Sequence, residues 1–185
     1  MKILYINSCV REESRTKILS EYLLSYLKGE VTELVLENSG ICALNREQLK
    51  NRDEYVENTI DLKLAKQFAN ADIIVISAPF WDYSFPALLK DYIERINVLD
   101  VTFYYENGFP FGCCKAKKLY YVSTAGGPFY ADFGYNYIKR LANEFYGIKD
   151  CSCIYAENLD MDGYDPEKIM IEAKKTIDDL FNTKS

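Results

Sequence analysis

An aromatic stretch at residues 78–87 carries side chains that could bind a flat ligand. Pro79 and Pro86 stiffen it, and between them stand three large rings: Phe80, Trp81 and Tyr83. Such rings suit an aromatic ring system as a partner. The stretch follows the apolar run at residues 73–76 and precedes an apolar pattern of helical spacing. We therefore expect a loop at the carboxyl end of a buried strand, where open α/β sheets bind ligands. The simpler interpretation is that these rings only cap the sheet.

A second candidate is the polar loop after the first apolar run at residues 2–6. It offers the hydroxyls of Ser8, Ser14 and Thr16, and the charge of Arg15, just where a helix should begin. The amides and macrodipole of a helix N-terminus attract anions, and an arginine can add charge-assisted hydrogen bonds to a phosphate. The alternative is that Ser14 is an ordinary N-cap and the basic residues are solvated. Neither a G-x-G-x-x-G nor a Walker pattern is present, which disfavours a dinucleotide or a nucleoside triphosphate.

A third candidate, at residues 124–127, is rich in glycine. Its four residues are Thr124, Ala125, Gly126 and Gly127. Glycines let a backbone approach a ligand closely and expose its amides, although a plain tight turn would also explain them.

The elements that position these loops alternate along the chain. Strand-like runs are predicted at residues 2–6, 31–36, 73–77, 118–123 and 151–156, with amphipathic helical patterns between and after them. This alternation predicts an α/β fold: a flavodoxin-like five-stranded parallel sheet of order 2-1-3-4-5 with helices on both faces. Residues 38–58 give the weakest secondary-structure signal, and a short helix is predicted near residues 46–50. Residues 102–117 are predicted as a connection with a turn at Asn107-Gly108.

Composition limits the possible functions. At 185 residues we expect one domain over the whole chain, and a net charge of −6 disfavours a nucleic-acid partner. No apolar run approaches the length of a membrane span and no signal peptide is evident, so we expect a cytoplasmic protein. The six cysteines are expected to be reduced thiols, and the absence of histidine excludes Ser-His-Asp and Cys-His catalysis and disfavours a metal site.

The three loops converge at one edge of the predicted sheet. A phosphate site beside an aromatic bed fits a mononucleotide flavin, FMN, better than the other ligands considered.

At this point the chain resembles the FMN-dependent NADH-azoreductase family of flavodoxin-like NAD(P)H quinone oxidoreductases. The resemblance covers nearly the whole chain. It depends on four motifs in order: Asn7-Ser8 with Ser14-Arg15-Thr16, residues 78–92, residues 102–108 and residues 123–127.

The resemblance implies specific roles. The loop with Ser8 and residues 14–16 would hold the FMN phosphate. Residues 79–83 and 124–127 would line the isoalloxazine, and the protein would be a homodimer. Two departures are evident: Asp82 stands where the family commonly has asparagine, and Ala125 where it often has arginine. If the Asp82 side chain faces the ring, we expect its charge to lower the flavin potential.

The activity implied is a ping-pong, two-electron reduction of quinones, azo compounds or nitroaromatics by NAD(P)H. No catalytic side chain is required, because the flavin carries the redox chemistry. Tyr83, Phe129 and Tyr130 are the candidate acceptor contacts. Of 27 aromatic residues, 12 lie between Phe103 and Tyr137, and we expect this region to form a dimer contact.

Two other classes compete with this interpretation. A flavodoxin-like electron carrier would bind FMN without NAD(P)H turnover. A signalling receiver module would need an acidic pair after the first strand, where Asn7-Ser8 stand instead.

Overall fold

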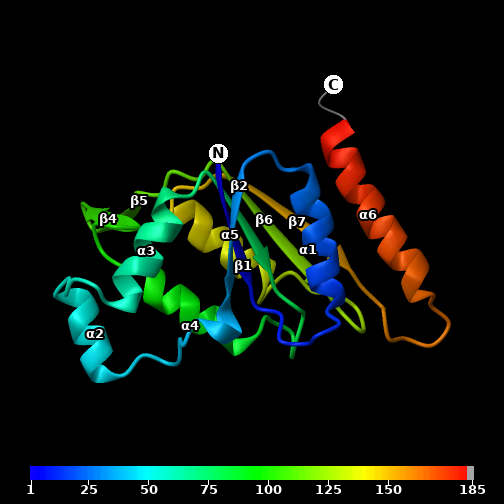
Figure 1. Ribbon diagram of the computed structural model, residues 1–185, viewed down its shortest axis with the longest axis horizontal. Helices are drawn as coiled ribbons and strands as arrows, with labels where there is room; N and C mark the ends of the chain where they lie inside the picture. The colour runs from blue at the N-terminus through cyan, green and yellow to red at the C-terminus, as the bar shows by residue number, and fades with distance from the viewer. Residues whose placement is uncertain (183–185) are drawn as a thin grey trace.

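The computed structural model describes residues 1–182 of the chain. Figure 1 shows its strands and helices in chain order. The strands are β1 (Lys2–Asn7), β2 (Glu30–Val35), β3 (Ile73–Ser77), β4 (Phe103–Glu106), β5 (Phe109–Gly112), β6 (Lys118–Thr124) and β7 (Asp150–Ala156). The α-helices are α1 (Arg15–Tyr26), α2 (Arg46–Asp53), α3 (Ile60–Asn70), α4 (Ala87–Ile96), α5 (Tyr135–Glu144) and α6 (Pro166–Asn182), with a 3₁₀ turn at Leu36–Asn38.

Five strands form a parallel sheet in the order β2-β1-β3-β6-β7. This is the predicted order 2-1-3-4-5 once the strands of the main sheet are numbered in turn, so the predicted fold class is confirmed. The central strand β3 is apolar and largely buried because helices cover both of its faces.

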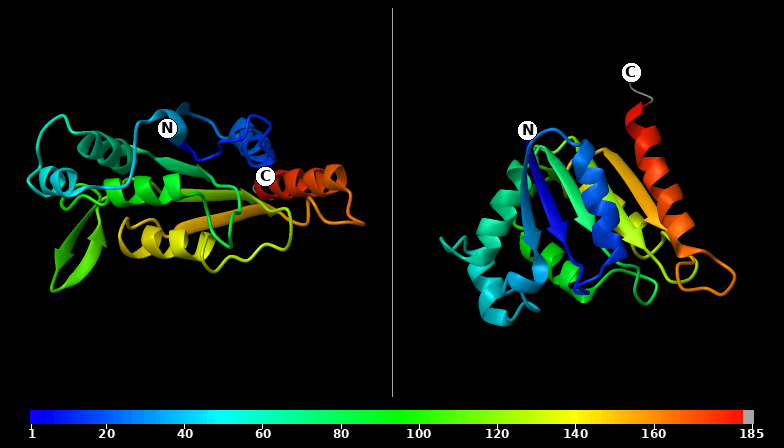
Figure 2. Two further views of the ribbon diagram at one scale, coloured as in Figure 1. Left: turned by 90° about the horizontal axis from the view of Figure 1, so that it is seen from below. Right: turned by 45° about the vertical axis from the view of Figure 1, so that its right-hand side comes forward.

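Two hydrophobic clusters divide the core between the faces of the sheet. On one face, β-strand residues such as Tyr5 and Val75 pack with Leu19 of α1 and Ile177 of α6. On the other face, a larger cluster joins the sheet to α3, α4 and α5, as the views in Figure 2 show. Helices therefore lie on both faces, as the alternating sequence pattern predicts.

The connection at residues 102–117 contains an antiparallel hairpin, β4–β5, that the sequence reasoning did not expect. It projects from the body of the molecule at the lower left of the left view in Figure 2. Its two-residue loop is Asn107-Gly108, with φ values of 51° and 81°. Both values are positive, as a two-residue type I′ hairpin loop requires, and Asn-Gly is the favoured sequence for it. The turn was thus recognised, but the strands flanking it were not.

Arg95 connects a buried ion pair to the segment before α2, for which the sequence pattern makes no clear prediction. The Arg95 guanidinium lies 2.6 Å from the Asp61 carboxylate, and both side chains are almost fully buried. Arg95 also donates to the carbonyl oxygen of Cys42 at 2.6 Å. Helix α2 itself begins with a capping box between Asn45 and Gln48. The short helix predicted near residues 46–50 is confirmed and extends to Asp53.

The carboxyl ends of the parallel strands meet at the lower edge of Figure 1. Backbone hydrogen bonds continue the sheet ladder into the loops there: Phe80 N donates to Thr124 O, and Ala125 N donates to Ala156 O. The loops after β3, β6 and β7 are thereby fixed side by side. Among the described residues, no helix is long and apolar enough to cross a membrane.

Candidate functional site

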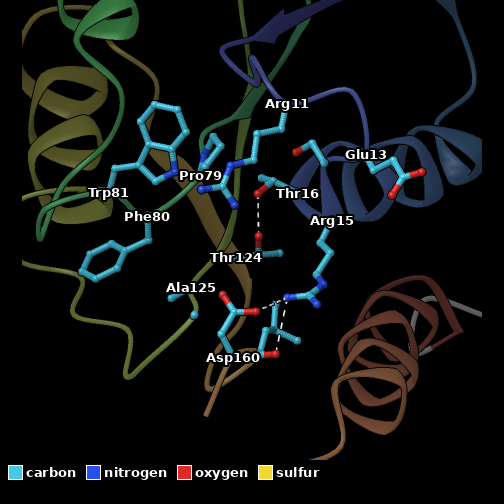
Figure 3. A pocket seen from close by; sticks show the side chains of 13 residues that line it. Arg11, Glu13, Arg15, Thr16, Pro79, Phe80, Trp81, Thr124, Ala125 and Asp160 are labelled. Atoms are coloured by element: carbon cyan, nitrogen blue, oxygen red, sulfur yellow. Dashed lines mark hydrogen bonds and ion pairs between the residues drawn. The ribbon is translucent and has the colours of Figure 1, made fainter.

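A pocket of about 440 Å³ opens at this edge of the sheet. Figure 3 shows that side chains from the loops after β1, β3, β6 and β7 surround it. The lining residues are Arg11, Glu13, Ser14, Arg15, Thr16, Pro79, Phe80, Trp81, Thr124, Ala125, Gly126, Leu159 and Asp160. The three loops that the sequence singled out therefore do reach one cavity, together with a fourth.

We call one side of the pocket the polar wall: Ser14, Arg15, Thr16, Thr124 and Asp160. Ser14 is the N-cap of α1, and its hydroxyl accepts a hydrogen bond from Lys17 N at 3.2 Å. Thr16 is 1% exposed, and its hydroxyl lies 2.6 Å from that of Thr124. This hydroxyl pair joins the first turn of α1 to the end of β6.

The first turn of α1 begins at the pocket, because Ser14, Arg15 and Thr16 all line it. Amides of a first helical turn have no acceptor within the helix, and the macrodipole makes that end positive. The polar wall is therefore suited to an anionic group. Ser14 combines both of the roles that the sequence left open, since it caps the helix and lines the pocket.

Arg15 reaches across the pocket to the loop after β7. Its Nη1 lies 2.7 Å from Asp160 Oδ1 and 3.4 Å from the carbonyl oxygen of Leu159, as the dashed lines in Figure 3 mark. The sequence predicted Arg15 as a phosphate ligand. In the structure its guanidinium is already paired with a carboxylate of the same pocket.

A second arginine stands at the mouth of the pocket. The Arg11 guanidinium carbon lies 5.9 Å from the centroid of the Trp81 ring, a cation–π arrangement. In Figure 3 Arg11 reaches toward the centre of the pocket, whereas Glu13 points away from it. Arg11 thus adds positive charge where the polar and aromatic sides meet.

We call the other side the aromatic wall: Phe80 and Trp81, with the rings of Tyr83, Phe129, Tyr130 and Tyr155 beyond them. Trp81 and Ser84 exchange two backbone hydrogen bonds of 2.9 and 2.8 Å, which close a tight turn. The two central residues, Asp82 and Tyr83, have φ values of 49° and 65°. These left-handed conformations are uncommon for a bulky residue such as tyrosine, so the turn carries local strain.

Ring contacts connect the aromatic wall. Phe80 meets Phe129 edge to face at 5.2 Å, and Phe129 stacks on Tyr155 at 4.7 Å. Tyr83 stacks on Tyr130 at 5.7 Å. The three residues predicted to contact an acceptor, Tyr83, Phe129 and Tyr130, therefore lie in one cluster of rings around Phe80.

Four of the predicted cofactor residues do not line the pocket: Ser8, Asp82, Tyr83 and Gly127. Ser8 is 1% exposed, and its hydroxyl donates to the carbonyl oxygen of Ser77 at 2.7 Å. Asp82 and Tyr83 are exposed in the turn beside the pocket. The expectation that the Asp82 charge acts on a bound ring stays a prediction.

Sequence reasoning missed Leu159 and Asp160 as pocket residues. The signal was available, because a fifth parallel strand at residues 151–156 must also end at the edge where the other three loops meet. Arg11 and Glu13 also line the pocket without having been singled out.

The buried thiol in the loop after β1 has no reactive character. Cys9 is 7% exposed, and its sulfur lies 3.1 Å from the Ser77 hydroxyl. Burial raises the pKa of the Cys9 thiol, so it stays protonated near neutral pH. No group of three or more Asp, Glu or Cys side chains within residues 1–182 is placed to hold a metal ion.

Comparison with known proteins places the chain among named relatives. It is 37% identical over 190 residues to the FMN-dependent NADH:quinone oxidoreductase 2 of Clostridium acetobutylicum, covering 91% of this chain and 92% of that protein. It is 34% identical over 196 residues to the FMN-dependent NADH:quinone oxidoreductase of Caldicellulosiruptor bescii, covering 97% of each.

Solved structures share the fold at lower identity. An azoreductase from Bacillus anthracis matches with a TM-score of 0.86 at 20% identity over 99% of both chains. A second, an FMN-dependent NADH-azoreductase from Bacillus anthracis solved in complex with FMN, matches with a TM-score of 0.82 at 19% identity over 99% of both chains. A family profile described as flavodoxin-like fold matches residues 1–181. The resemblance drawn from the sequence is thereby confirmed, and the chain belongs to the flavodoxin-like fold family together with these FMN-dependent NADH:quinone oxidoreductases.

Proposed function

We propose that this chain is an FMN-dependent NADH:quinone oxidoreductase of the azoreductase type. The observation that carries the proposal is a single pocket in which the N-terminus of α1 faces an aromatic wall. Relatives more than 30% identical over nearly the full length bear the name FMN-dependent NADH:quinone oxidoreductase.

The residues of the pocket fit FMN. The polar wall supplies helix amides, the hydroxyls of Thr16 and Thr124, and the guanidinium of Arg15, which together match a phosphate dianion. The aromatic wall supplies the Trp81 ring, and the backbone of Ala125 and Gly126 borders the same cavity. We propose that residues 14–16 hold the phosphate and that residues 79–81 and 124–126 line the ring.

Bound FMN would supply the two-electron redox chemistry. The chain's own residues would bind, orient and shield. Trp81 and Phe80 would fix the plane of the ring, and the exposed pair Tyr83–Tyr130 would offer a flat surface for an aromatic acceptor. Quinones and azo compounds, the acceptors in the relatives' names, are flat molecules of that kind. No protein base is assigned, in line with the absence of histidine.

We further propose that two copies of the chain associate through the hairpin β4–β5 and the loop before α5. Three aromatic side chains there are strongly exposed: Tyr105 at 56%, Phe109 at 70% and Phe133 at 69%. Exposed aromatic residues are enriched in protein interfaces. Sedimentation or light-scattering mass at several concentrations tests this, and a monomer mass at every concentration would contradict it.

The spectrum of the purified protein tests the proposed activity. We expect a flavin absorbance band after reconstitution with FMN, rapid anaerobic bleaching by NADH, and recovery of the band on adding a benzoquinone. An electron carrier of the flavodoxin kind would show the band but would bleach slowly with NADH. A protein that takes up no FMN would contradict both interpretations.

A further inference from the structure

The Arg15–Asp160 ion pair spans the pocket between two elements that are far apart in the sequence. Arg15 is the first residue of α1, and Asp160 lies in the loop after β7. Their nearest side-chain atoms are 2.7 Å apart, and both residues line the cavity. The pair therefore sits beside the helix N-terminus that we assign to the phosphate.

The backbone holds Asp160 in place independently of Arg15. Asp160 N donates to Gly126 O at 2.9 Å, and Asn158 N donates to Gly127 O at 2.9 Å. The Asp160 carboxylate also packs on Gly126, since a Cβ added there would lie only 2.6 Å from Asp160 Oδ2. The carboxylate is thus a fixed point against which the long Arg15 side chain can be oriented.

Arg15 keeps donors for a ligand while it is paired. A guanidinium carries five N–H donors, and the hydrogen bonds to Asp160 and Leu159 both use Nη1. Within residues 1–182 no hydrogen bond from Nε or Nη2 of Arg15 is seen. Tethered through Nη1, the guanidinium can direct its remaining donors at an anion.

The pair is poorly placed to stabilise the fold. The side chains are 41% and 63% exposed, and exposed ion pairs contribute little to folding because water and salt screen them. A role in ligand binding explains the pair better than a role in stability.

We propose that Asp160 is a positioning residue for the cofactor phosphate, acting through Arg15. This inference rests on the proposed function, because it assigns the anion in the pocket to FMN. Asp160 would order the long Arg15 side chain before the cofactor arrives, so that less rotamer freedom is lost on binding. The Asp160 charge alone would have the opposite effect, since a carboxylate repels a phosphate.

Dissociation constants for FMN and for riboflavin, measured by flavin fluorescence on the apoprotein, separate these effects. Riboflavin has the same ring without the phosphate, so the ratio of the two constants reports on the phosphate site alone. For Asp160→Ala we expect FMN binding to weaken about fivefold, the scale of ordering one long side chain, with riboflavin unchanged. For Asp160→Asn, which keeps an acceptor oxygen for Arg15, we expect FMN affinity within about twofold of the wild type.

Two controls fix the interpretation. Asp162→Ala removes an exposed acidic residue from the same loop and should leave the ratio unchanged. In an Arg15→Ala background, Asp160→Ala should have no further effect on the ratio, because the residue through which it acts is gone. Equal thermal midpoints of the apoprotein variants show that folding is intact.

Three results would overturn the inference. The first is an unchanged ratio in Asp160→Ala, and the second is a tighter FMN complex in both Asp160 variants. The third is an equal loss of FMN affinity when Asp160→Ala is added to Arg15→Ala. In each of these the wild type still binds FMN, so the proposed function survives. A wild type that does not bind FMN would overturn the proposed function, and this inference with it.

Discussion

The polar wall and the aromatic wall of the pocket are held in place by different interactions. The polar wall is joined by directional bonds between distant parts of the chain, such as Thr16 to Thr124 at 2.6 Å and Arg15 to Asp160 at 2.7 Å. The aromatic wall is held by ring packing, such as Phe80 on Phe129 and Phe129 on Tyr155.

This difference teaches where each wall tolerates change. A hydrogen bond depends on distance and angle, and a buried polar atom left without its partner is costly. Ring contacts are individually weak, numerous and tolerant of small shifts. The polar wall should therefore discriminate sharply by charge, whereas the aromatic wall should accept many flat molecules. Dissociation constants of FMN and of riboflavin, measured for variants in each wall, test this contrast.

The largest expected effect is on the polar wall, from Arg15→Pro. Proline is tolerated at the first position of a helix, and Ser14 already has the extended conformation (ψ 115°) that the residue before a proline requires. The change removes both the Arg15 amide donor and its guanidinium. We expect FMN to bind about 100-fold more weakly, since two charge-assisted hydrogen bonds are lost, while riboflavin affinity stays the same.

Arg15→Ala is the matched control, because it removes the side chain and keeps the amide. Its loss of FMN affinity should be smaller than that of Arg15→Pro, and both are read by fluorescence titration. Equal losses of FMN and riboflavin affinity in either variant would show that the wall does not select for phosphate.

The next largest effect is expected on the aromatic wall, from Trp81→Ala. Loss of one stacking surface should weaken FMN and riboflavin alike, by about 30-fold, because the ring they share is affected. The same titrations measure it, and Trp81→Phe should restore most of the affinity. A loss confined to FMN would place the phosphate, and not the ring, beside Trp81.

Thr16→Val tests whether the hydroxyl pair of the polar wall supports both the stability of the fold and the binding of FMN. Valine keeps the shape but leaves the Thr124 hydroxyl without its partner at 2.6 Å. We expect the free energy of unfolding to fall by about 1–2 kcal/mol and FMN affinity to fall several-fold, since a polar group loses its hydrogen bond. Denaturant titration of the apoprotein measures the first quantity. Ser20→Ala, in the same helix, removes a hydroxyl that donates to the Thr16 carbonyl oxygen away from the pocket lining, and it should leave FMN affinity unchanged.

The smallest effect is expected behind the aromatic wall, from Tyr155→Ala. Tyr155 stacks on Phe129, whose backbone N–H also donates to Glu157 Oε2 at 2.6 Å. Loss of one ring contact should raise the KM for a quinone about threefold without changing FMN affinity, because the hydrogen bond still holds Phe129. Steady-state kinetics with NADH at saturation measure it. An altered FMN affinity would mean that the outer rings also support the cofactor.

The fold was predictable because its signals are local. Apolar strand runs and amphipathic helices alternate along the chain, and parallel strands so connected have few permitted arrangements. A glycine such as Gly29 is the usual signal for a helix end, yet α1 ends at Tyr26 with Leu27 as its C-cap. Gly29 instead allows a close approach to the Met1 carbonyl oxygen just before β1 and β2 begin to pair, so it is not a helix cap.

The candidate site was predictable only in part. The loops were found because each follows a strand, and Ser14, Arg15, Thr16 and Trp81 all line the pocket. Ser8 does not line the pocket, and its hydroxyl bonds to the Ser77 carbonyl. A serine hydroxyl can serve a ligand or the backbone equally well. No local pattern distinguishes those two uses.

The sequence by itself determined the order of elements, the class of sheet and the edge at which a ligand would bind, because periodicity and turn chemistry act over a few residues. The partner of Arg15 was decided only by the tertiary structure. Asp160 lies 145 residues away, and it meets Arg15 because β6 and β7 pair in parallel and carry their loops to the start of α1. Such contacts depend on the register and direction of whole elements, which no short stretch of sequence encodes.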